Sequence, residues 1–276
     1  MKKNDLVIAI YFLNQKAIEN DFLNKILKFS TNQIHTLFNT PPNRFSYSYF
    51  HKNKLYNKDV KYTKLNEQKM YKNINGSTHV GIELAIVPKD FKFRISDTDI
   101  SFLYSPQDEF TNYSSLKLQM DCDKIKDRMQ SGDVEKLVEE LVSMLSDNGC
   151  KISYGFAFSM PRIKQPKAYA TGIASGRLTE EEKELVHHFG NNKNKCGERI
   201  WDVFWCNIFN SKHLSGSGVI NDIENIIGKD CLNKHGDEVI MCTIPIDILE
   251  IENQLTEYNN YRNQLRQVLK KYNLLM

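Results

Sequence analysis

This chain of 276 residues lacks the short motifs that mark several common enzyme classes. The Ser-Gly-Ser-Gly run at 215–218 is not followed by Lys-Ser or Lys-Thr, so it is not a phosphate-binding loop. No Gly-x-Ser-x-Gly nucleophile elbow occurs. The cysteines form no Cys-x-x-Cys pair, and no two histidines have the spacing that lets both reach one zinc ion from a helix. We therefore predict no catalytic, cofactor-binding or metal-ligating residue and no cofactor.

Long apolar runs are missing as well. No stretch approaches the ~18 apolar residues of a membrane span, so we predict no membrane association. The apolar run Leu6–Leu13 is short, and polar residues follow it without a small-residue cleavage site. This pattern favours a first β-strand over a signal peptide. Scattered cysteines without an export signal predict a cytoplasmic protein with reduced, mostly buried thiols.

Acidic residues are scarce at the front of the chain. Residues 1–75 hold 13 Lys and Arg against 5 Asp and Glu, whereas the remaining 201 residues hold 24 against 29. The front is therefore basic and the back mildly acidic. The overall net charge of +3 is too balanced to indicate a nucleic-acid-binding protein, and a Lys-rich face in contact with solvent accounts for the basic front. We therefore do not expect nucleic acid as a partner.

Apolar periodicity predicts an alternation of strands and helices. Runs with a period of two or continuous apolar runs predict strands, and spacings of three and four predict amphipathic helices. The predicted strands are 6–13, 79–88, 98–104, 114–120, 151–160, 199–206 and 238–244. The predicted helices are 17–38, 133–147, 179–189, 219–227 and 252–275. This order predicts an α+β fold, with helices packed on a mixed or mainly antiparallel sheet and a long C-terminal helix.

Residues 47–78 are harder to interpret. They are polar, rich in Lys, Asn and Tyr, and weakly periodic, so a strand followed by a long loop is as far as the pattern goes. No repeat and no low-complexity linker divides the chain. We predict one α+β domain over 1–276, with 1–75 as a candidate basic N-terminal subdomain.

The segment Arg199–Cys206 contains both tryptophans of the chain. Read as a strand, it is mostly apolar on both faces, which is typical of a central strand covered on both sides. Asp202 is the exception, because a buried carboxylate needs a partner. Arg199 and Arg177 are the arginines nearest to it in the sequence, and we predict that one of them supplies the ion pair.

Two thiols could in principle pair with an imidazole. Cys196 and Cys206 lie near His213 in the sequence, and a Cys–His pair can act as a nucleophile and its base. However, Cys206 belongs to a dense apolar stretch, where a thiol more often serves as inert packing. We predict a structural role for it.

A second arrangement is the pair Asp121 and Asp123, which follows a predicted strand. An Asp-x-Asp at a strand end can hold a divalent cation, but it needs a third carboxylate. Asp108 and Glu109 lie on the preceding loop, and nothing in the sequence directs them toward this pair. A polar turn is the simpler interpretation.

One region of the chain resembles a known group of proteins. A small-residue segment (AYATGIASG, 168–176) and an acidic helix precede a run in which Arg199, Asp202, Val203, Phe204, Trp205, Asn207, His213 and Leu214 match the pattern. This order, over about 80–250, resembles large α+β immunity proteins of bacterial polymorphic-toxin and type VI secretion effector systems. Those families share no catalytic residues.

The resemblance implies a cytoplasmic binding protein whose partner is a cognate protein toxin. We expect the contact at the start of the helix 179–189, where Thr179 is the N-cap and Glu180, Glu181 and Glu182 form an acidic first turn. Two alternatives stay open: a metal-dependent enzyme acting on nucleic acid or nucleotides, and an unrelated partner-binding regulatory domain. The sequence also leaves open the oligomeric state and the identity and activity of the toxin.

Overall fold

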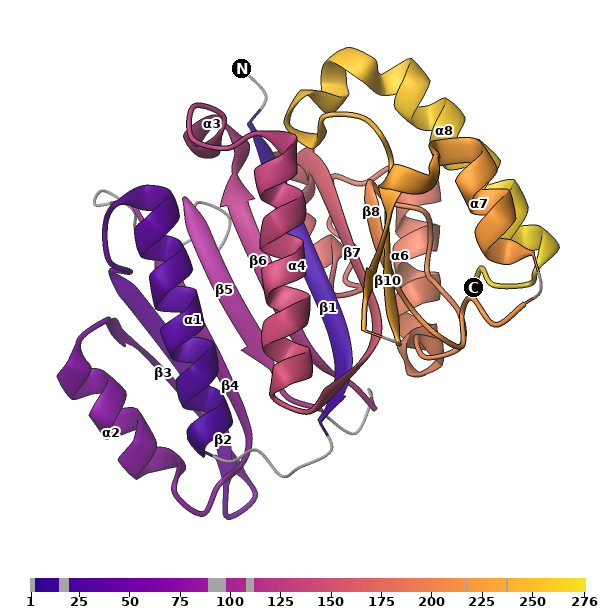
Figure 1. The fold of residues 1–276 in the computed structure, drawn as a ribbon. Coiled ribbons are helices and arrows are strands. Elements are labelled where there is room, and N and C mark those ends of the chain that lie inside the picture. The colour runs from indigo at the N-terminus through magenta and orange to yellow at the C-terminus, as the bar shows by residue number, and fades with distance from the viewer. Residues whose placement is uncertain (1–2, 15–19, 89–97, 108–111, 217, 237) are drawn as a thin grey trace.

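A ten-stranded antiparallel sheet organises the protein. We describe it from a computed structural model over residues 3–14, 20–88, 98–107, 112–216, 218–236 and 238–276 (Figure 1). Neighbouring strands follow the order β3-β2-β4-β5-β6-β1-β7-β8-β10-β9. The strands are β1 (Asn4–Asn14), β2 (Arg44–His51), β3 (Lys54–Lys61), β4 (Thr78–Ile86), β5 (Ile100–Ser105), β6 (Ser114–Asp121), β7 (Cys150–Pro161), β8 (Cys206–Asn210), β9 (Leu232–His235) and β10 (Val239–Thr243). The predicted α+β class with a mainly antiparallel sheet is confirmed.

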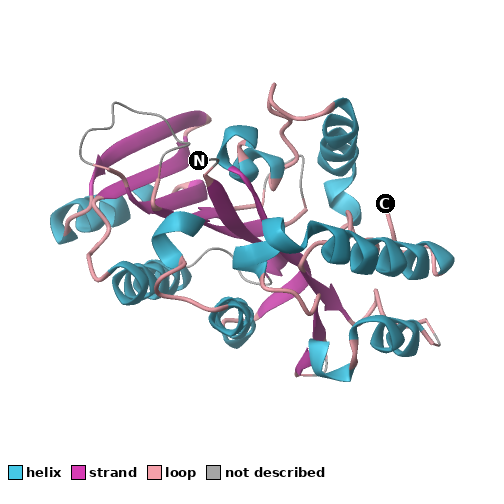
Figure 2. Ribbon diagram, turned by 90° about the horizontal axis from the view of Figure 1, so that it is seen from above, coloured by secondary structure: helices cyan, strands magenta, loops and turns pink. Residues whose placement is uncertain are grey.

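Helices lie on both faces of this sheet (Figures 1 and 2). The face toward the viewer in Figure 1, called the front, carries α1 (Asn20–Phe38), α2 (Lys64–Ile74) and α4 (Ser131–Asp147). The back carries α5 (Pro166–Tyr169) and α6 (Glu180–Asn192). A short helix, α3 (Cys122–Ile125), follows β6, and α7 (Val219–Ile227) packs on α8 (Leu255–Lys271), the predicted long C-terminal helix. Within the described residues, no helix has the length and apolar character needed to cross a membrane.

Strand β1 lies at the centre of the sheet and is apolar on both faces. It pairs with β6 on one side and β7 on the other, and each residue from Leu6 to Phe12 is at most 3% exposed. On the front, the ring of Phe22 from α1 packs against Phe12. On the back, Phe189 from α6 packs against Tyr11. The predicted first strand is confirmed, and its two apolar faces explain why helices are needed on both sides.

The ends of several helices follow from their capping residues. At the start of α4 the Gln130 N–H donates to Asp133 Oδ2 at 2.8 Å. The helix ends beside Gly149, whose φ of +73° suits a residue without a side chain. Helix α7 ends at Gly228, with a φ of +88°. The glycines at these two ends were readable in the sequence as helix terminators.

The structure of residues 47–78 differs from the expected strand and loop. The segment forms the hairpin β2–β3 followed by α2, and Thr63 caps that helix by accepting a hydrogen bond from the Asn66 backbone N–H at 3.1 Å. Strand β3 lies at the sheet edge, and nearly all its side chains are exposed. An edge strand of this kind needs no apolar period, so periodicity gave no signal for it. Strand β9, at the other edge, was missed for the same reason.

The predicted strand Arg199–Cys206 is wrong in position, because the strand begins only at Cys206. Side chains bind the preceding backbone in place of a sheet partner: the Val203 N–H donates to Asp202 Oδ1 at 2.8 Å, and the Phe204 N–H donates to Asn207 Oδ1 at 3.3 Å. The predicted burial is confirmed, since residues 200–210 are all buried. The C-terminal helix is shorter than predicted, because a 3₁₀ segment (Ile248–Gln254) precedes it.

Trp205 is the largest fully buried side chain, and its indole Nε1 donates to the Ile246 carbonyl at 2.7 Å. We expect Trp205→Ala to lower the free energy of unfolding by about 3–5 kcal/mol, since it creates a large cavity and leaves that carbonyl unpaired. Leu255→Ala, at a position that is 49% exposed, is the matched control and should cost far less. Urea denaturation of both variants measures the difference, and equal midpoints would contradict the burial.

Candidate functional site

The acidic first turn of α6 is built as predicted, but its three acids have different roles. Thr179 and Glu182 form the capping box: the Glu182 N–H donates to Thr179 Oγ1 at 3.2 Å, and the Thr179 N–H donates to Glu182 Oε2 at 2.9 Å. Glu182 also accepts a hydrogen bond from Lys164 at 2.6 Å. Burial tends to raise the pKa of Glu182, but the hydrogen bonds from Lys164 and Thr179 outweigh it and lower that pKa. Glu182 is therefore committed to internal contacts.

The other two acids face solvent. Glu180 is 85% exposed along its side chain and accepts a hydrogen bond from Lys183 at 2.5 Å, which offsets much of its charge. Glu181 is exposed and lines a cleft between α6 and α8. Of the three predicted contact residues, Glu181 is therefore the one placed at a hollow of the surface.

This hollow, called the α6–α8 cleft, has a volume of about 400 Å³. One wall belongs to α6 and the other to α8, and the C-terminal residues also contribute to the lining. Its lining consists of Glu181, Glu184, Leu185, His188, Trp201, Asp202, Arg266, Lys270, Leu275 and Met276. Glu181 and Glu184 come from α6, and Arg266 and Lys270 come from α8, so the lining of the cleft carries both signs of charge.

A buried ionic cluster holds the α8 wall in place. Asp202 is 3% exposed and accepts hydrogen bonds from two arginines of α8. Arg266 Nε donates to Asp202 Oδ1 at 2.6 Å, and both Arg262 and Arg266 donate to Oδ2. Burial tends to raise the pKa of Asp202, but the two guanidinium groups outweigh it and lower that pKa. The carboxylate stays ionised and clamps α8 to the core.

The predicted partners of Asp202, Arg199 and Arg177, are therefore wrong. The actual partners lie about sixty positions further along the chain, and the fold brings them to Asp202 because α8 passes over the buried segment 200–205. Arg262 Nε also donates to the Val203 carbonyl at 2.8 Å. Sequence proximity could not reveal this pairing, although two arginines four positions apart on one helix were a usable signal for a shared anion.

Stacked aromatic rings make the α6 wall rigid. The ring of Trp201 stacks on Phe189 with centroids 4.2 Å apart and lies 4.8 Å from the ring of Tyr169. Its indole Nε1 donates to the Leu185 carbonyl at 3.0 Å, which fixes the tryptophan to α6. Both walls of the α6–α8 cleft are therefore anchored to buried groups.

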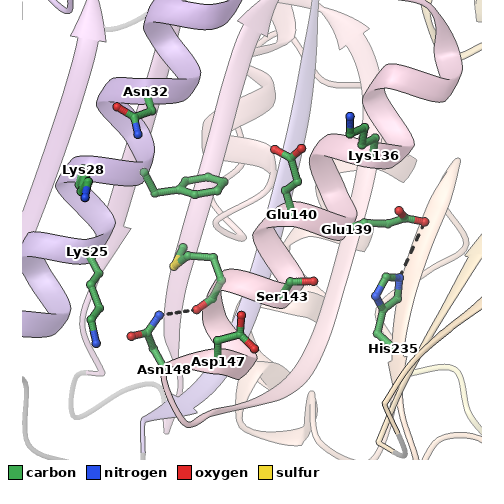
Figure 3. Close-up of a pocket in the computed structure, with 12 residues that line it drawn as sticks. Lys25, Lys28, Asn32, Lys136, Glu139, Glu140, Ser143, Asp147, Asn148 and His235 are labelled. Atoms are coloured by element: carbon green, nitrogen blue, oxygen red, sulfur yellow. Dashed lines mark hydrogen bonds and ion pairs between the residues drawn. The ribbon is translucent and has the colours of Figure 1, made fainter.

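A second, larger hollow of about 650 Å³ lies between α1 and α4 (Figure 3). Lys25 and Lys28 of α1 stand on one side of it, and Glu139 and Glu140 of α4 stand on the other. Gln33 of α1 bridges the two helices by donating to Glu140 at 2.6 Å. Lys25, Lys28 and Lys136 are exposed here, and among the described residues the lining includes no ion pair as buried as that of Asp202. We therefore regard the α6–α8 cleft as the better-defined site.

The thiols and the imidazole near 196–213 are poorly suited to nucleophilic chemistry. Burial raises the pKa of Cys196 and that of Cys206 to about 12, so both thiols stay protonated. Burial also lowers the pKa of His213 to about 4, against the opposing effect of the Cys196 and Arg199 backbone. The imidazole is therefore neutral, and its Nδ1 accepts a hydrogen bond from the Asn210 N–H at 3.2 Å. These groups pack and cap the core, as predicted for Cys206.

The Asp-x-Asp pair is also occupied by structural contacts. Asp121 is 1% exposed and caps α3 by accepting a hydrogen bond from the Asp123 N–H at 3.0 Å. Its other carboxylate oxygen lies 2.9 Å from Arg162 Nη2. Asp108 and Glu109 lie outside the described residues. Among the residues that the structure describes, no three His, Cys, Asp or Glu side chains form a group that could hold a metal ion.

A polar cluster on the back of the central strands was missed by the sequence analysis. Arg162 donates to Asp5 Oδ1 from Nε at 2.9 Å and from Nη2 at 2.6 Å, and Gln119 donates to Asp5 Oδ2 at 2.6 Å. Burial raises the pKa of Asp5 to about 6 despite the guanidinium beside it. The signal was present in Ser114–Asp121, which alternates polar and apolar residues although all eight are buried. The alternation of polar and apolar residues by itself suggested that one face of this strand meets solvent.

Comparison of the chain with protein-family models, with curated proteins and with solved structures found no match in any of the three.

We expect Asp202→Asn to destabilise the protein by about 3 kcal/mol, because it leaves two arginines of α8 without their buried counterion. Hydrogen exchange should show the loss concentrated in α8 and the C-terminal residues. Asp222→Asn removes the exposed contact between Asp222 of α7 and Lys271 of α8. This variant is the control, and we expect a much smaller effect. Similar exchange rates in both variants would contradict the clamp.

We expect His213 to make the protein acid-sensitive. Its pKa is about 4 in the folded state and about 6.5 when unfolded, so the unfolded chain binds the extra proton first. Stability is therefore lost as the pH falls from about 6.5 to 4, by up to about 3 kcal/mol. Relative to wild type, His213→Gln should lose less stability over this window in urea titrations at several pH values.

Asp5 supplies a control of opposite sign. Its raised pKa means that the folded state holds the proton more tightly, so this group lowers stability as the pH rises from about 4 to 6. Asp5→Asn should remove that decline. A wild-type profile parallel to that of both variants would contradict the two assignments.

Proposed function

We propose that this protein is a cytoplasmic immunity protein that binds a cognate bacterial protein toxin and neutralises it. The sequence resemblance over about 80–250 suggests this class. The α6–α8 cleft supports it as a contact surface, because its walls are fixed before any partner arrives. A rigid surface loses little conformational entropy on binding, which favours tight association.

The observation that carries the proposal is the α6–α8 cleft beside the Asp202 cluster, whose lining includes both acidic and basic side chains. Its volume of about 400 Å³ suits one or two inserted side chains, in the way that a central pocket accepts an anchoring residue at a protein interface. Glu181 and Glu184 on one wall and Lys270 on the other offer partners for a basic and an acidic group. A polypeptide segment with both charges complements this arrangement.

The acids of α6 would act mainly on the encounter step. Glu181 and Glu184 are exposed, so their negative charges would attract a basic partner. Such attraction speeds association more than it adds affinity. Glu180 is paired with Lys183, and Glu182 is held by Lys164. We therefore place the contact on Glu181 and Glu184 first, with Glu180 at its margin and Glu182 in support of the helix cap.

Co-expression with the product of the adjacent upstream gene tests the proposal. We expect pull-down of that protein and rescue of growth from its toxicity. Glu181→Lys combined with Glu184→Lys should slow association markedly and weaken rescue. Glu252→Lys combined with Glu257→Lys makes the same change of charge at exposed positions outside the cleft lining and should leave rescue intact.

Two outcomes separate the parts of this proposal. Folded wild-type protein that neither captures the neighbouring product nor rescues growth would rule out the immunity function. Full rescue by the Glu181→Lys and Glu184→Lys variant would keep that function but remove the α6–α8 cleft as its contact surface.

A further inference from the structure

The hairpin β2–β3 and helix α2 form a basic unit at one end of the sheet, here called the basic module (residues 44–75). It contains eight Lys and Arg but only two acids, Asp59 and Glu67. Arg44 donates two hydrogen bonds to Asp59, so these two charges balance each other. Glu67 accepts a hydrogen bond from the neutral Tyr62 hydroxyl at 2.9 Å and keeps its charge. Eight basic residues against two acids leave the module with a net charge of +6.

The positive charge comes from seven exposed lysines: Lys52, Lys54, Lys58, Lys61, Lys64, Lys69 and Lys72. None of the seven forms an ion pair with another described residue. Elsewhere the protein pairs many of its lysines, as with Lys164 and Glu182. Lysines without an ion pair to a described residue also occur elsewhere, such as Lys229 and Lys234, but this module holds seven of them within 21 positions. The overall net charge of +3 conceals this concentration.

Strand β3 places a tyrosine between two of these lysines. Side chains two positions apart on a strand lie on the same face, so Lys54, Tyr56 and Lys58 share the front of the edge strand. The register confirms the face, because Tyr56 pairs with Tyr49 and Lys58 pairs with Tyr47. Strand β3 is the outermost strand in the described part of the sheet, so no described strand lies beyond these three side chains.

The tyrosine ends a column of stacked rings. The ring of Tyr47 stacks on Tyr49 at an interplanar angle of 16°, and Tyr49 stacks on Tyr56 with centroids 5.2 Å apart at 11°. Tyr47 and Tyr49 are buried, whereas Tyr56 is 39% exposed. The column is therefore held rigid from within, and its last ring is presented to solvent.

We propose that the edge of β3 binds a single-stranded nucleic acid, with a base stacked on Tyr56 and the neighbouring phosphates on Lys54 and Lys58. Aromatic rings set among cationic side chains are the usual means of binding unpaired bases without sequence preference. Phosphate contacts by lysine supply the remaining affinity and make it dependent on salt. This inference goes beyond the proposed immunity function and does not depend on it.

Lysines on an edge strand also protect a sheet from pairing with other chains. That role accounts for charge at the edge but not for an exposed ring at the end of a stacked column. An acidic protein surface would satisfy the lysines equally well, but its carboxylates do not call for an aromatic ring between the lysines, whereas alternating phosphates and bases do. The stacking geometry therefore favours a nucleic acid over an acidic protein.

Fluorescence anisotropy with a labelled oligothymidylate of about 20 nucleotides tests the inference on the full chain. At about 50 mM salt we expect binding that weakens steeply as salt rises. Lys54→Gln combined with Lys58→Gln should weaken it at least about tenfold and reduce the slope of log affinity against log salt by about 1.4, because each contact on a single strand contributes about 0.7.

Further variants test whether the ring of Tyr56 is needed and whether the position of the lysines matters, as opposed to the total positive charge. Tyr56→Ala should weaken binding about tenfold, whereas Tyr56→Phe should bind like the wild type, because the ring supplies the contact. Lys229→Gln combined with Lys234→Gln removes the same charge from exposed positions at and near the opposite sheet edge and should change binding little. Thermal melting confirms that each variant is folded.

Three results would overturn the inference. Wild-type protein that fails to bind at low salt excludes the site. Equal losses in the β3 and Lys229/Lys234 variants would show that the attraction is diffuse. Binding of poly-glutamate but not of oligothymidylate would assign the module to an acidic protein partner. Because growth rescue is measured separately, failure here leaves the immunity proposal standing.

Discussion

Burial of β1 on both faces is the constraint on which the rest of the structure depends. A central strand with apolar residues at successive positions cannot leave either side to solvent, and Leu6 to Phe12 is such a strand. The front therefore needs α1 and α4, and the back needs α6, whose Phe189 reaches Tyr11 and Phe156. Once α6 is fixed on the back, its solvent side becomes one wall of the α6–α8 cleft. The position of the candidate site thus follows from the composition of a strand remote from it in the sequence.

The opposite wall depends on an ionic contact and not on apolar packing. Helix α8 is polar over most of its length, with Tyr258, Leu265 and Leu269 as its buried residues, so a narrow apolar stripe alone would hold it loosely. Asp202 supplies the missing specificity by binding Arg262 and Arg266. The irregular backbone at 202–204 is part of the same arrangement, because the Asp202 carboxylate accepts a hydrogen bond from the Val203 N–H as well as from the two guanidinium groups. The irregular backbone at 202–204 thus helps to position α8.

The sequence predicted well what depends on local chemistry. Helix α6 begins at Thr179 because its cap is a short-range interaction, and α4 and α7 end at glycines for the same reason. What it could not predict were contacts between distant segments, such as Asp202 with Arg266, and elements without an apolar period, such as β3. The acidic residues Glu180–Glu182 were visible in the sequence, but only the packing of Lys164 and Lys183 against them distinguished their roles. Local rules thus located the candidate site on the chain, whereas tertiary contacts decided its composition.

The pairing of β1 also has a consequence for the order in which the chain can fold during synthesis. Its first strand finds no neighbour in the segment that follows it, since Asp5 pairs with Asp121 and with Met160. At about 5–20 residues per second, the ribosome needs on the order of ten to thirty seconds to supply both partners. During that interval β1 has neither of its partner strands. The β2–β3 hairpin has only two residues between its strands, so it can form as soon as it leaves the ribosome. The apolar strand β1 therefore stays unpaired in the nascent chain for longer than the β2–β3 hairpin, and an unpaired apolar strand is exposed to aggregation during that time.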